Sequence, residues 1–160
     1  MKVAVLFYDS EGGTGYTGGE SGTISEARAI LSKYDEHLSW YIYSIEYVDP
    51  NNPSTWMPDE SLAGPLDYSH HEMDGWHYFT LDVPVEVPGE FFIVADRGEG
   101  GTKFFRDTSY DEPYHSRFYR KPLWGWEVPL YEYNIRIEWE SDNPSVEATT
   151  WGAIKASLNE

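Results

Sequence analysis

The clearest pattern along this chain is an alternation of apolar and polar side chains over residues 130–140. Aromatic or aliphatic residues occupy every second position there, and polar or charged residues stand between them. A two-residue period places the apolar side chains on one face of an extended backbone, which is the pattern of a half-buried strand. Residues 38–48 are apolar on both faces, which predicts a second, central strand. We expect Trp40 and Trp139 of these strands to point into the core.

Five shorter stretches rich in aromatic and β-branched residues complete a set of seven predicted strands, at residues 3–8, 76–83, 90–96, 101–106 and 116–120. Turn residues separate them, at Pro84, at Pro88 with Gly89, at residues 97–101 and at residues 111–113. Many short strands with little helix predict an all-β fold, specifically an antiparallel β-sandwich of jelly-roll type. We expect one sandwich domain over residues 1–140 and a C-terminal tail over residues 141–160.

Two segments are harder to assign from the pattern. Thr23 and Glu26 have the spacing of a helix capping box, and good helix formers follow over residues 26–31. Because residues 23–34 lead directly into the strand at residue 38, we favour a strand over a helix there. Residues 49–75 contain four prolines, so we predict one long loop excursion, either a functional lip or a solvated insertion.

Composition narrows the classes of function. The 160 residues include 7 Trp, 13 Tyr and 7 Phe, carry a formal net charge of −17 and contain no cysteine. The absence of cysteine excludes thiolate catalysis, cysteine-bound zinc and disulfides. Excess negative charge repels nucleic acids and anionic membranes, and no stretch approaches the roughly 18 apolar residues of a membrane span. We therefore expect no nucleic-acid partner and no membrane insertion.

Catalytic motifs are scarce, and we expect no enzymatic activity. The chain has neither a Gly-x-Ser-x-Gly nor a His-Glu-x-x-His motif. Gly13, Gly15 and Gly18 follow a predicted strand, in the position of a flavodoxin phosphate loop. A flavodoxin also needs helices between parallel strands, and the downstream sequence does not predict them. A flexible glycine-rich turn is therefore the favoured interpretation, and a flavodoxin-like flavin-binding protein is the least favoured alternative function.

Acidic residues in loops make calcium the candidate cofactor, because this ion prefers several hard oxygen ligands. The candidate ligands form two groups, one with Asp9 and Glu11 and the other with Asp107, Asp111 and Glu112. A solvated acidic surface is the alternative interpretation. A histidine-rich stretch at residues 70–77 offers zinc-type ligands, but an exposed polar segment that runs into the next strand is the favoured interpretation.

Aromatic residues in or beside predicted loops are candidate ligand contacts, because flat rings match the apolar faces of sugar rings. These candidates are Trp56, Tyr114, Tyr119, Trp124 and Trp126. The alternative is that Trp124 and Trp126 cap the core.

Several short motifs carry a family resemblance. They are the segment from Val87-Pro88-Gly89 to Ala95, Asp107-Thr108-Ser109, Pro113, Ser116-Arg117-Phe118-Tyr119, Ile135-Arg136-Ile137 and the Trp151-Gly152-Ala153-Ile154-Lys155 tail. Together they resemble accessory β-sandwich modules of large secreted bacterial proteins. The resemblance implies an extracellular, noncatalytic module that ends a longer chain, and it transfers two polar positions, Asp107 and Arg117. Arg117 is thereby added to the candidate ligand-binding residues. The alternative is that Asp107 and Arg117 form a buried pair that braces the fold without binding a ligand.

The sequence thus predicts a secreted or cell-surface binding module, noncatalytic and steadied by calcium, whose loop aromatics bind a carbohydrate or a cell-surface protein. A structural, assembly or export appendage is the alternative.

Overall fold

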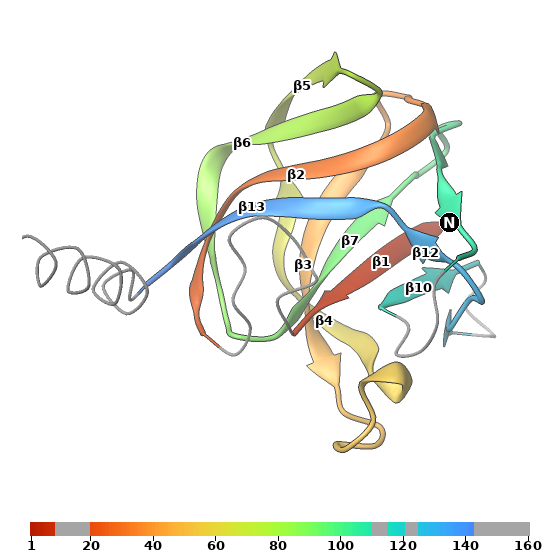
Figure 1. Cartoon of the computed structure of the whole chain (residues 1–160). Helices are drawn as coiled ribbons and strands as arrows, with labels where there is room; N and C mark the ends of the chain where they lie inside the picture. Colours follow the sequence, from red (N-terminus) through yellow and green to blue (C-terminus); the bar gives the residue numbers. More distant parts are fainter. Residues whose placement is uncertain (9–19, 110–114, 121–124, 143–160) are drawn as a thin grey trace, which may run out of the picture.

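The computed structural model describes residues 1–8, 20–109, 115–120 and 125–142, and within these ranges the protein is built from antiparallel strands (Figure 1). One sheet has six strands in the order β11-β10-β1-β7-β3-β4. Its strands are β1 (Lys2–Phe7), β3 (Ser39–Glu46), β4 (Met57–Leu66), β7 (Phe91–Asp96), β10 (Ser116–Tyr119) and β11 (Trp126–Glu127).

The second sheet has the order β13-β2-β6-β5, and β8 pairs with the end of β2. Its strands are β2 (Gly22–Lys33), β5 (Tyr68–Met73), β6 (Trp76–Val87), β8 (Lys103–Phe104) and β13 (Ile135–Ser141). A separate pair consists of β9 (Arg106–Asp107) and β12 (Glu132–Tyr133). A short 3-10 helix, η1 (Pro53–Thr55), precedes β4.

The main core lies between the two sheets. Phe7, Trp40 and Ile93 from the first sheet and Phe79 and Ile137 from the second belong to one buried cluster. The Trp40 and Phe79 ring centroids are 5.0 Å apart. Trp40 and Trp139 are 1% and 6% exposed, so both point inward as predicted. The two sheets and their shared core confirm the sandwich-like, all-β fold, whereas the strand orders do not confirm jelly-roll connections.

The prediction of a long loop over residues 49–75 is wrong. Strands β4 and β5 occupy most of this segment, and only Asp67 separates them, so the chain passes from the edge of one sheet to the edge of the other. Prolines are tolerated on edge strands because one side of such a strand has no pairing partner. The exposed composition of β4 therefore reflects its edge position: β3 holds it in place despite three register irregularities.

Three predicted strand boundaries also differ. The strand predicted to end before Pro84 continues to Val87, on the flank of β2. The single strand predicted over residues 130–140 is broken at Asn134, whose carbonyl accepts a hydrogen bond from the Ile30 amide at 3.1 Å. Residues 101–106 likewise divide between β8 and β9, which pair with different strands. In contrast, the favoured strand over residues 23–34 is confirmed as β2.

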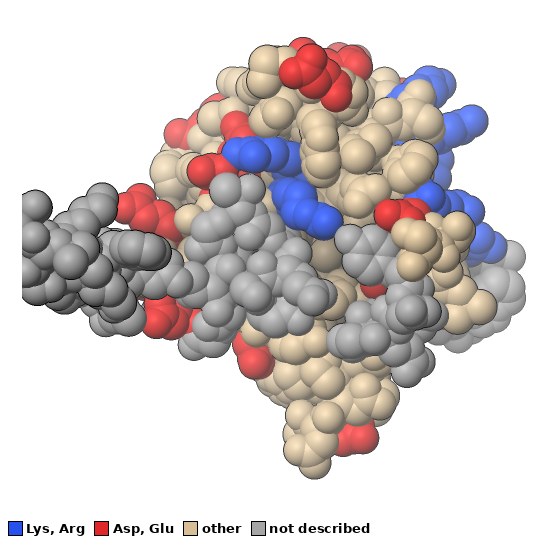
Figure 2. Space-filling view, viewed as in Figure 1, with Lys and Arg blue, Asp and Glu red and all other residues tan. Residues whose placement is uncertain are grey.

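The outer face of the second sheet is polar. Arg28 donates to Glu26 at 2.7 Å and also to Glu138 on the neighbouring strand, and its guanidinium lies 5.4 Å from the Tyr78 ring centroid. Figure 2 shows basic and acidic side chains next to one another over the region of β2 and β13. This surface needs no apolar cover, since its polar side chains pair with one another.

Among the described residues, no helix has the length and apolar character needed to cross a bilayer. The glycine-rich segment at Gly13 and residues 143–160 of the predicted C-terminal tail lie outside the described residues, and Ser141, the first residue of that tail, ends β13.

Replacing Gly22 with alanine tests the packing of β2 against β13. A Cβ atom at Gly22 would overlap the Trp139 indole and lie 2.5 Å from the Glu140 carbonyl oxygen. We expect Gly22→Ala to lower the free energy of unfolding by about 1–3 kcal/mol, because overpacking displaces backbone or a large ring. The matched control is Gly101→Ala, whose Cβ would meet only the flexible Lys33 side chain. Urea unfolding of both variants measures the difference, and equal destabilisation would contradict this packing.

Candidate functional site

The outer face of the six-stranded sheet gathers aromatic side chains at one end. The strand register places Lys2, Tyr119 and Trp126 in one row across β1, β10 and β11. Tyr41 and Tyr43 project from β3 on the same face, opposite Val94 and Phe92. We call Lys2, Tyr41, Tyr43, Tyr119 and Trp126 the aromatic face.

The rings of the aromatic face form a connected set. Tyr43 lies 6.2 Å from Tyr41 and 6.3 Å from Trp126, and Tyr119 lies 5.4 Å from Trp126, between ring centroids. All four rings remain partly exposed. The Lys2 amine lies 5.5 Å from the Tyr119 ring centroid and 6.0 Å from that of Tyr43, within reach of a cation–π interaction. The result is a nearly continuous ring surface with one positive charge.

The rings rest on a second apolar cluster. Ala4, Leu6, Phe92 and Val94 alternate with the main-core residues of β1 and β7, and each is 0% exposed. Tyr41, Tyr43 and Trp126 pack against this cluster. Because Ala4 and Val94 are small, side chains from strands at opposite sides of the sheet can lean over them and meet. Packing therefore fixes the ring positions.

Arg117 is buried beneath this surface and does not contact solvent. Its guanidinium donates to the carbonyl oxygens of Trp56 at 2.7 Å, Pro53 at 2.9 Å and Ser116 at 2.7 Å, and it lies 5.7 Å from the Phe92 ring centroid. Burial lowers the pKa of Arg117 to about 10, and nearby Glu132 partly opposes that shift. Arg117 was predicted either to contact a ligand or to brace the fold, and in the structure its side chain fastens η1 to the sheet.

Trp56, another of the predicted ligand contacts, is likewise buried, at 6% exposure. Its indole nitrogen donates to the Asp49 carbonyl at 2.8 Å, and its ring makes edge contacts with Tyr8 and Tyr47. The physical reason is the Arg117 anchor, which draws the backbone at Trp56 onto the sheet and buries the ring.

Of the remaining predicted aromatic residues, Tyr119 and Trp126 are brought together on the aromatic face, and Tyr114 and Trp124 lie outside the described residues. Lys2, Tyr41 and Tyr43 were not among the ligand contacts predicted from the sequence. The signal for Tyr41 and Tyr43 was the alternation of tyrosines within residues 38–48, but a central strand that is apolar on both faces is expected to be covered on both sides. Tertiary packing covers them only in part.

Asp107 is the one candidate calcium ligand of the five that lies within the described residues. The Asp107 carboxylate accepts hydrogen bonds from the Ser109 amide at 2.9 Å and the Ser109 hydroxyl at 2.6 Å, and these bonds lower its pKa. Asp9, Glu11, Asp111 and Glu112 lie outside the described residues.

No group of three metal-ligating side chains occurs within the described ranges. In the histidine-rich stretch, His70 and His77 share a hydrogen bond of 2.9 Å on β5 and β6, and the Tyr34 ring stacks on His70 at 3.8 Å between centroids.

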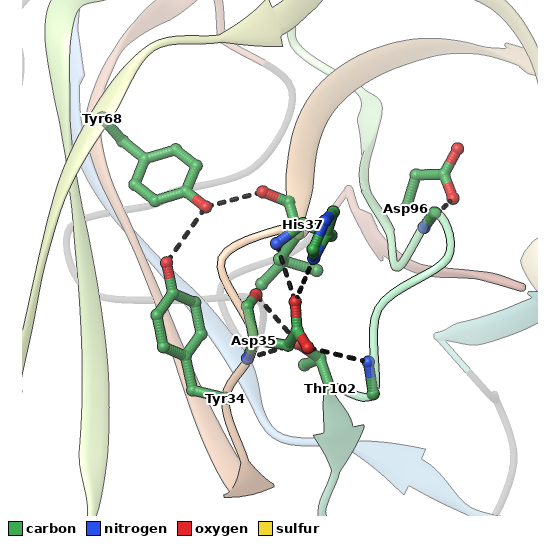
Figure 3. Close-up of polar contacts among 9 residues, drawn as sticks. Tyr34, Asp35, His37, Tyr68, Asp96 and Thr102 are labelled. Atoms are coloured by element: carbon green, nitrogen blue, oxygen red, sulfur yellow. Dashed lines mark hydrogen bonds and ion pairs between the residues drawn. The ribbon is translucent and has the colours of Figure 1, made fainter.

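A polar network fastens the turn after β2 to the loop before β8 (Figure 3). The Asp35 carboxylate accepts hydrogen bonds from the His37 amide at 3.0 Å, the His37 ring at 2.5 Å and the Gly101 amide at 3.3 Å. These bonds lower the pKa of Asp35 to about 2, and the carboxylate raises the pKa of His37. Thr102 completes the network through hydrogen bonds with the Asp35 backbone.

Comparisons of the chain with known protein families, with curated proteins and with solved structures gave no match. The arrangement of side chains is therefore the basis for assigning a function.

The Asp35–His37 pair generates a pH prediction. Because the folded pKa of Asp35 is depressed, its contribution to stability is present above the unfolded value of 3.8 and is lost as the pH falls towards about 2. The folded pKa of His37 is raised, so its contribution is full below the unfolded value of 6.5 and is lost as the pH rises through the folded pKa. We expect an NMR titration to give His37 a pKa above 6.5, and Asp35→Asn to lower it. An unchanged His37 titration in Asp35→Asn would contradict the pairing.

Calcium removal tests the metal hypothesis. If the acidic groups bind calcium, saturating calcium should raise the melting temperature relative to EDTA, because a ligand that binds only the folded state stabilises it. Asp107→Asn should reduce the increase if Asp107 is a ligand. Magnesium at the same ionic strength is the control for screening of the acidic surface. Identical melting temperatures in calcium and EDTA would exclude a stabilising site.

Proposed function

We propose that this protein is a noncatalytic module that binds carbohydrate through the aromatic face. The observation that carries the proposal is the partly exposed, mutually contacting set of rings formed by Tyr43, Tyr119 and Trp126. Aromatic rings offer an apolar surface with polar edges, which suits a sugar ring that has C–H groups on its face and hydroxyls around its rim. Rigid packing on the second apolar cluster lowers the entropy lost on binding.

Polar groups adjoin the rings. The cross-strand row that contains Lys2 continues through Asp96 to Ser39. These side chains offer an ammonium donor, a carboxylate acceptor and a hydroxyl for the rim of a sugar. Glycoside hydrolysis commonly requires a pair of carboxyl groups, whereas this row contains one carboxylate among the described residues. Stacking and hydrogen bonding are therefore the chemistry that the row supplies, in line with a binding role.

The setting that we propose for this binding is extracellular, with calcium as a stabilising ion at the acidic loops. The strongly acidic surface and the resemblance to accessory modules of secreted proteins support that setting. A cell-surface glycan or glycoprotein is then the natural partner. The aromatic face could instead meet a protein in an assembly role, and this alternative predicts an oligomer. Light scattering over a range of concentrations separates the two, since a strict monomer favours ligand binding.

A glycan array followed by calorimetry on the strongest hit tests the proposal. We expect Trp126→Ala and Tyr119→Ala each to weaken binding by about tenfold or more, because each removes a stacking surface. Trp126→Phe should retain part of the affinity. The matched control is Tyr78→Ala, which removes a ring from the polar outer face of the other sheet and should leave the affinity unchanged.

Circular dichroism of each variant confirms that the fold is intact. Failure of every glycan to saturate the wild-type protein would refute the carbohydrate proposal, as would an equal loss of affinity in Tyr78→Ala.

A further inference from the structure

A cavity of about 290 Å³ opens beside the start of β1. Several elements contribute to it: the residue before β1, the end of β2, the residue after β7, and strands β8, β9 and β12. Its lining consists of Met1, Ser32, Arg97, Lys103, Phe104, Arg106 and Tyr133. We call this cavity the basic pocket.

The residues that line the basic pocket carry a net positive charge, opposite in sign to the net charge of the protein. Three of its seven residues are cationic and none is acidic, in a chain with 28 Asp and Glu against 11 Lys and Arg. A fourth cation, Lys33, is paired directly across from Lys103 where β2 meets β8. Figure 2 shows basic side chains gathered along the side of the molecule where Figure 1 places the N-terminus and β12, whereas many of the acidic ones lie on the opposite side.

These cations lack acidic partners in the part of the chain that the structure describes. Within the described ranges, neither Lys33 nor any of the three cationic lining residues forms an ion pair. The Nε atom of Arg97 is buried and has no hydrogen-bond partner among the described residues. Like charges opposite each other destabilise a strand pair, and a buried donor without a partner costs free energy. An anion in the pocket would remove both penalties.

The pocket also has an apolar wall. Phe104 and Tyr133 are 9% and 2% exposed, and their ring centroids are 5.9 Å apart. Burial raises the pKa of Tyr133, so its hydroxyl stays protonated, and it lies 3.3 Å from the Tyr131 hydroxyl. The Arg106 guanidinium stacks over Tyr131 at 4.8 Å, which limits its motion. A flat apolar group would find complementary surface beside the cations.

The loop that carries Lys103 is held in place by the Asp35 network. Gly101 and Thr102 both hydrogen-bond to Asp35, and Lys103 follows them directly. Arg97 is tied to the start of β1 through its amide, which donates to the Met1 carbonyl at 3.1 Å. The backbone positions of two cationic residues are thus fixed by hydrogen bonds before any ligand arrives, which favours binding.

We propose that the basic pocket binds a small ring-bearing monocarboxylate. Arginine forks match a carboxylate, and the aromatic wall matches the ring attached to it. The cavity is at the lower end of the size range of ligand sites, which suits one ring. A bare inorganic anion would leave the apolar wall unused, and an extended polyanion would be repelled by the acidic remainder of the surface. A sugar acid and an aromatic acid both fit this chemistry.

The pocket is distinct from the carbohydrate site proposed above. Met1 packs against the main core and lines the pocket, whereas Lys2 belongs to the aromatic face on the other side of β1. Substitutions can therefore address the two sites separately.

Calorimetry at fixed ionic strength tests the proposal with benzoate, glucuronate, glucose and sulfate as ligands. We expect benzoate, glucuronate or both to saturate the protein with a Kd of roughly 1 mM or tighter. Lys103→Gln and Arg97→Gln should each weaken that binding by about tenfold. Arg136→Gln is the matched control: it removes the same charge at a residue outside the pocket lining, so affinity should change less than about twofold. Lys103 is exposed, so Lys103→Gln should fold normally even if Arg97→Gln does not.

The outcomes separate the two proposals. Carboxylate binding that Lys103→Gln weakens and Trp126→Ala leaves intact supports the basic pocket. The acid that binds more tightly, benzoate or glucuronate, shows whether the pocket prefers an aromatic acid or a sugar acid. Sulfate binding as tight as that of either carboxylate would overturn the role of the ring. Absence of saturation by both acids, or carboxylate binding lost in Trp126→Ala but kept in Lys103→Gln, would overturn the pocket assignment. Binding of neutral glycans tests the aromatic face alone.

Discussion

The arrangement of this protein depends on one constraint: strands β1 and β7 are apolar on both faces. Val5 and Ile93 enter the core between the sheets, and their neighbours Leu6 and Phe92 point to the opposite side. A sandwich ordinarily leaves the outer face of each sheet to water. Here the outer face of the six-stranded sheet must also be covered, since exposing these side chains would forfeit their hydrophobic stabilisation. The outer face of the second sheet has no such requirement, because polar side chains such as Arg28, Glu26 and Glu138 pair with one another there.

The cover has two parts with different properties. Near one end of the sheet, the segment containing η1 is fixed to it by Arg117, a buried cation whose donors satisfy backbone carbonyls. Because those carbonyls need partners, the backbone there stays close to the sheet and Trp56 is enclosed. At the other end, tyrosines and Trp126 lean over small residues and stay partly exposed. The proposed binding surface is thus a product of the same covering requirement, in the place where the cover is made of rings rather than backbone.

Positively charged side chains, like the exposed aromatic rings, are concentrated in particular places on the molecule. Arg28 and Arg117 make hydrogen bonds that stabilise the fold. The cations of the basic pocket instead come from distant parts of the chain and have no acidic partners among the described residues. In this chain of net charge −17 the penalties of such a cluster are local: like charges face each other across a strand pair, and a buried donor has no partner among the described residues. Its cost to folding is the physical argument that the pocket has a ligand. The aromatic face and the basic pocket flank the same strand end, so one short element positions both.

The sequence by itself determined the local properties: the all-β class and the inward direction of Trp40 and Trp139, because alternation and turn residues act over a few positions. It also favoured a strand over residues 23–34, because that segment leads directly into the next strand. Tertiary structure alone decided what depends on partners distant in the chain. Edge pairing made strands of residues 57–73, a buried arginine enclosed Trp56, and small residues let Tyr43 and Trp126 meet. The cations of the basic pocket came together for the same reason. Short-range patterns encode how a segment is built, whereas contacts between distant segments decide which side chains are left for a ligand.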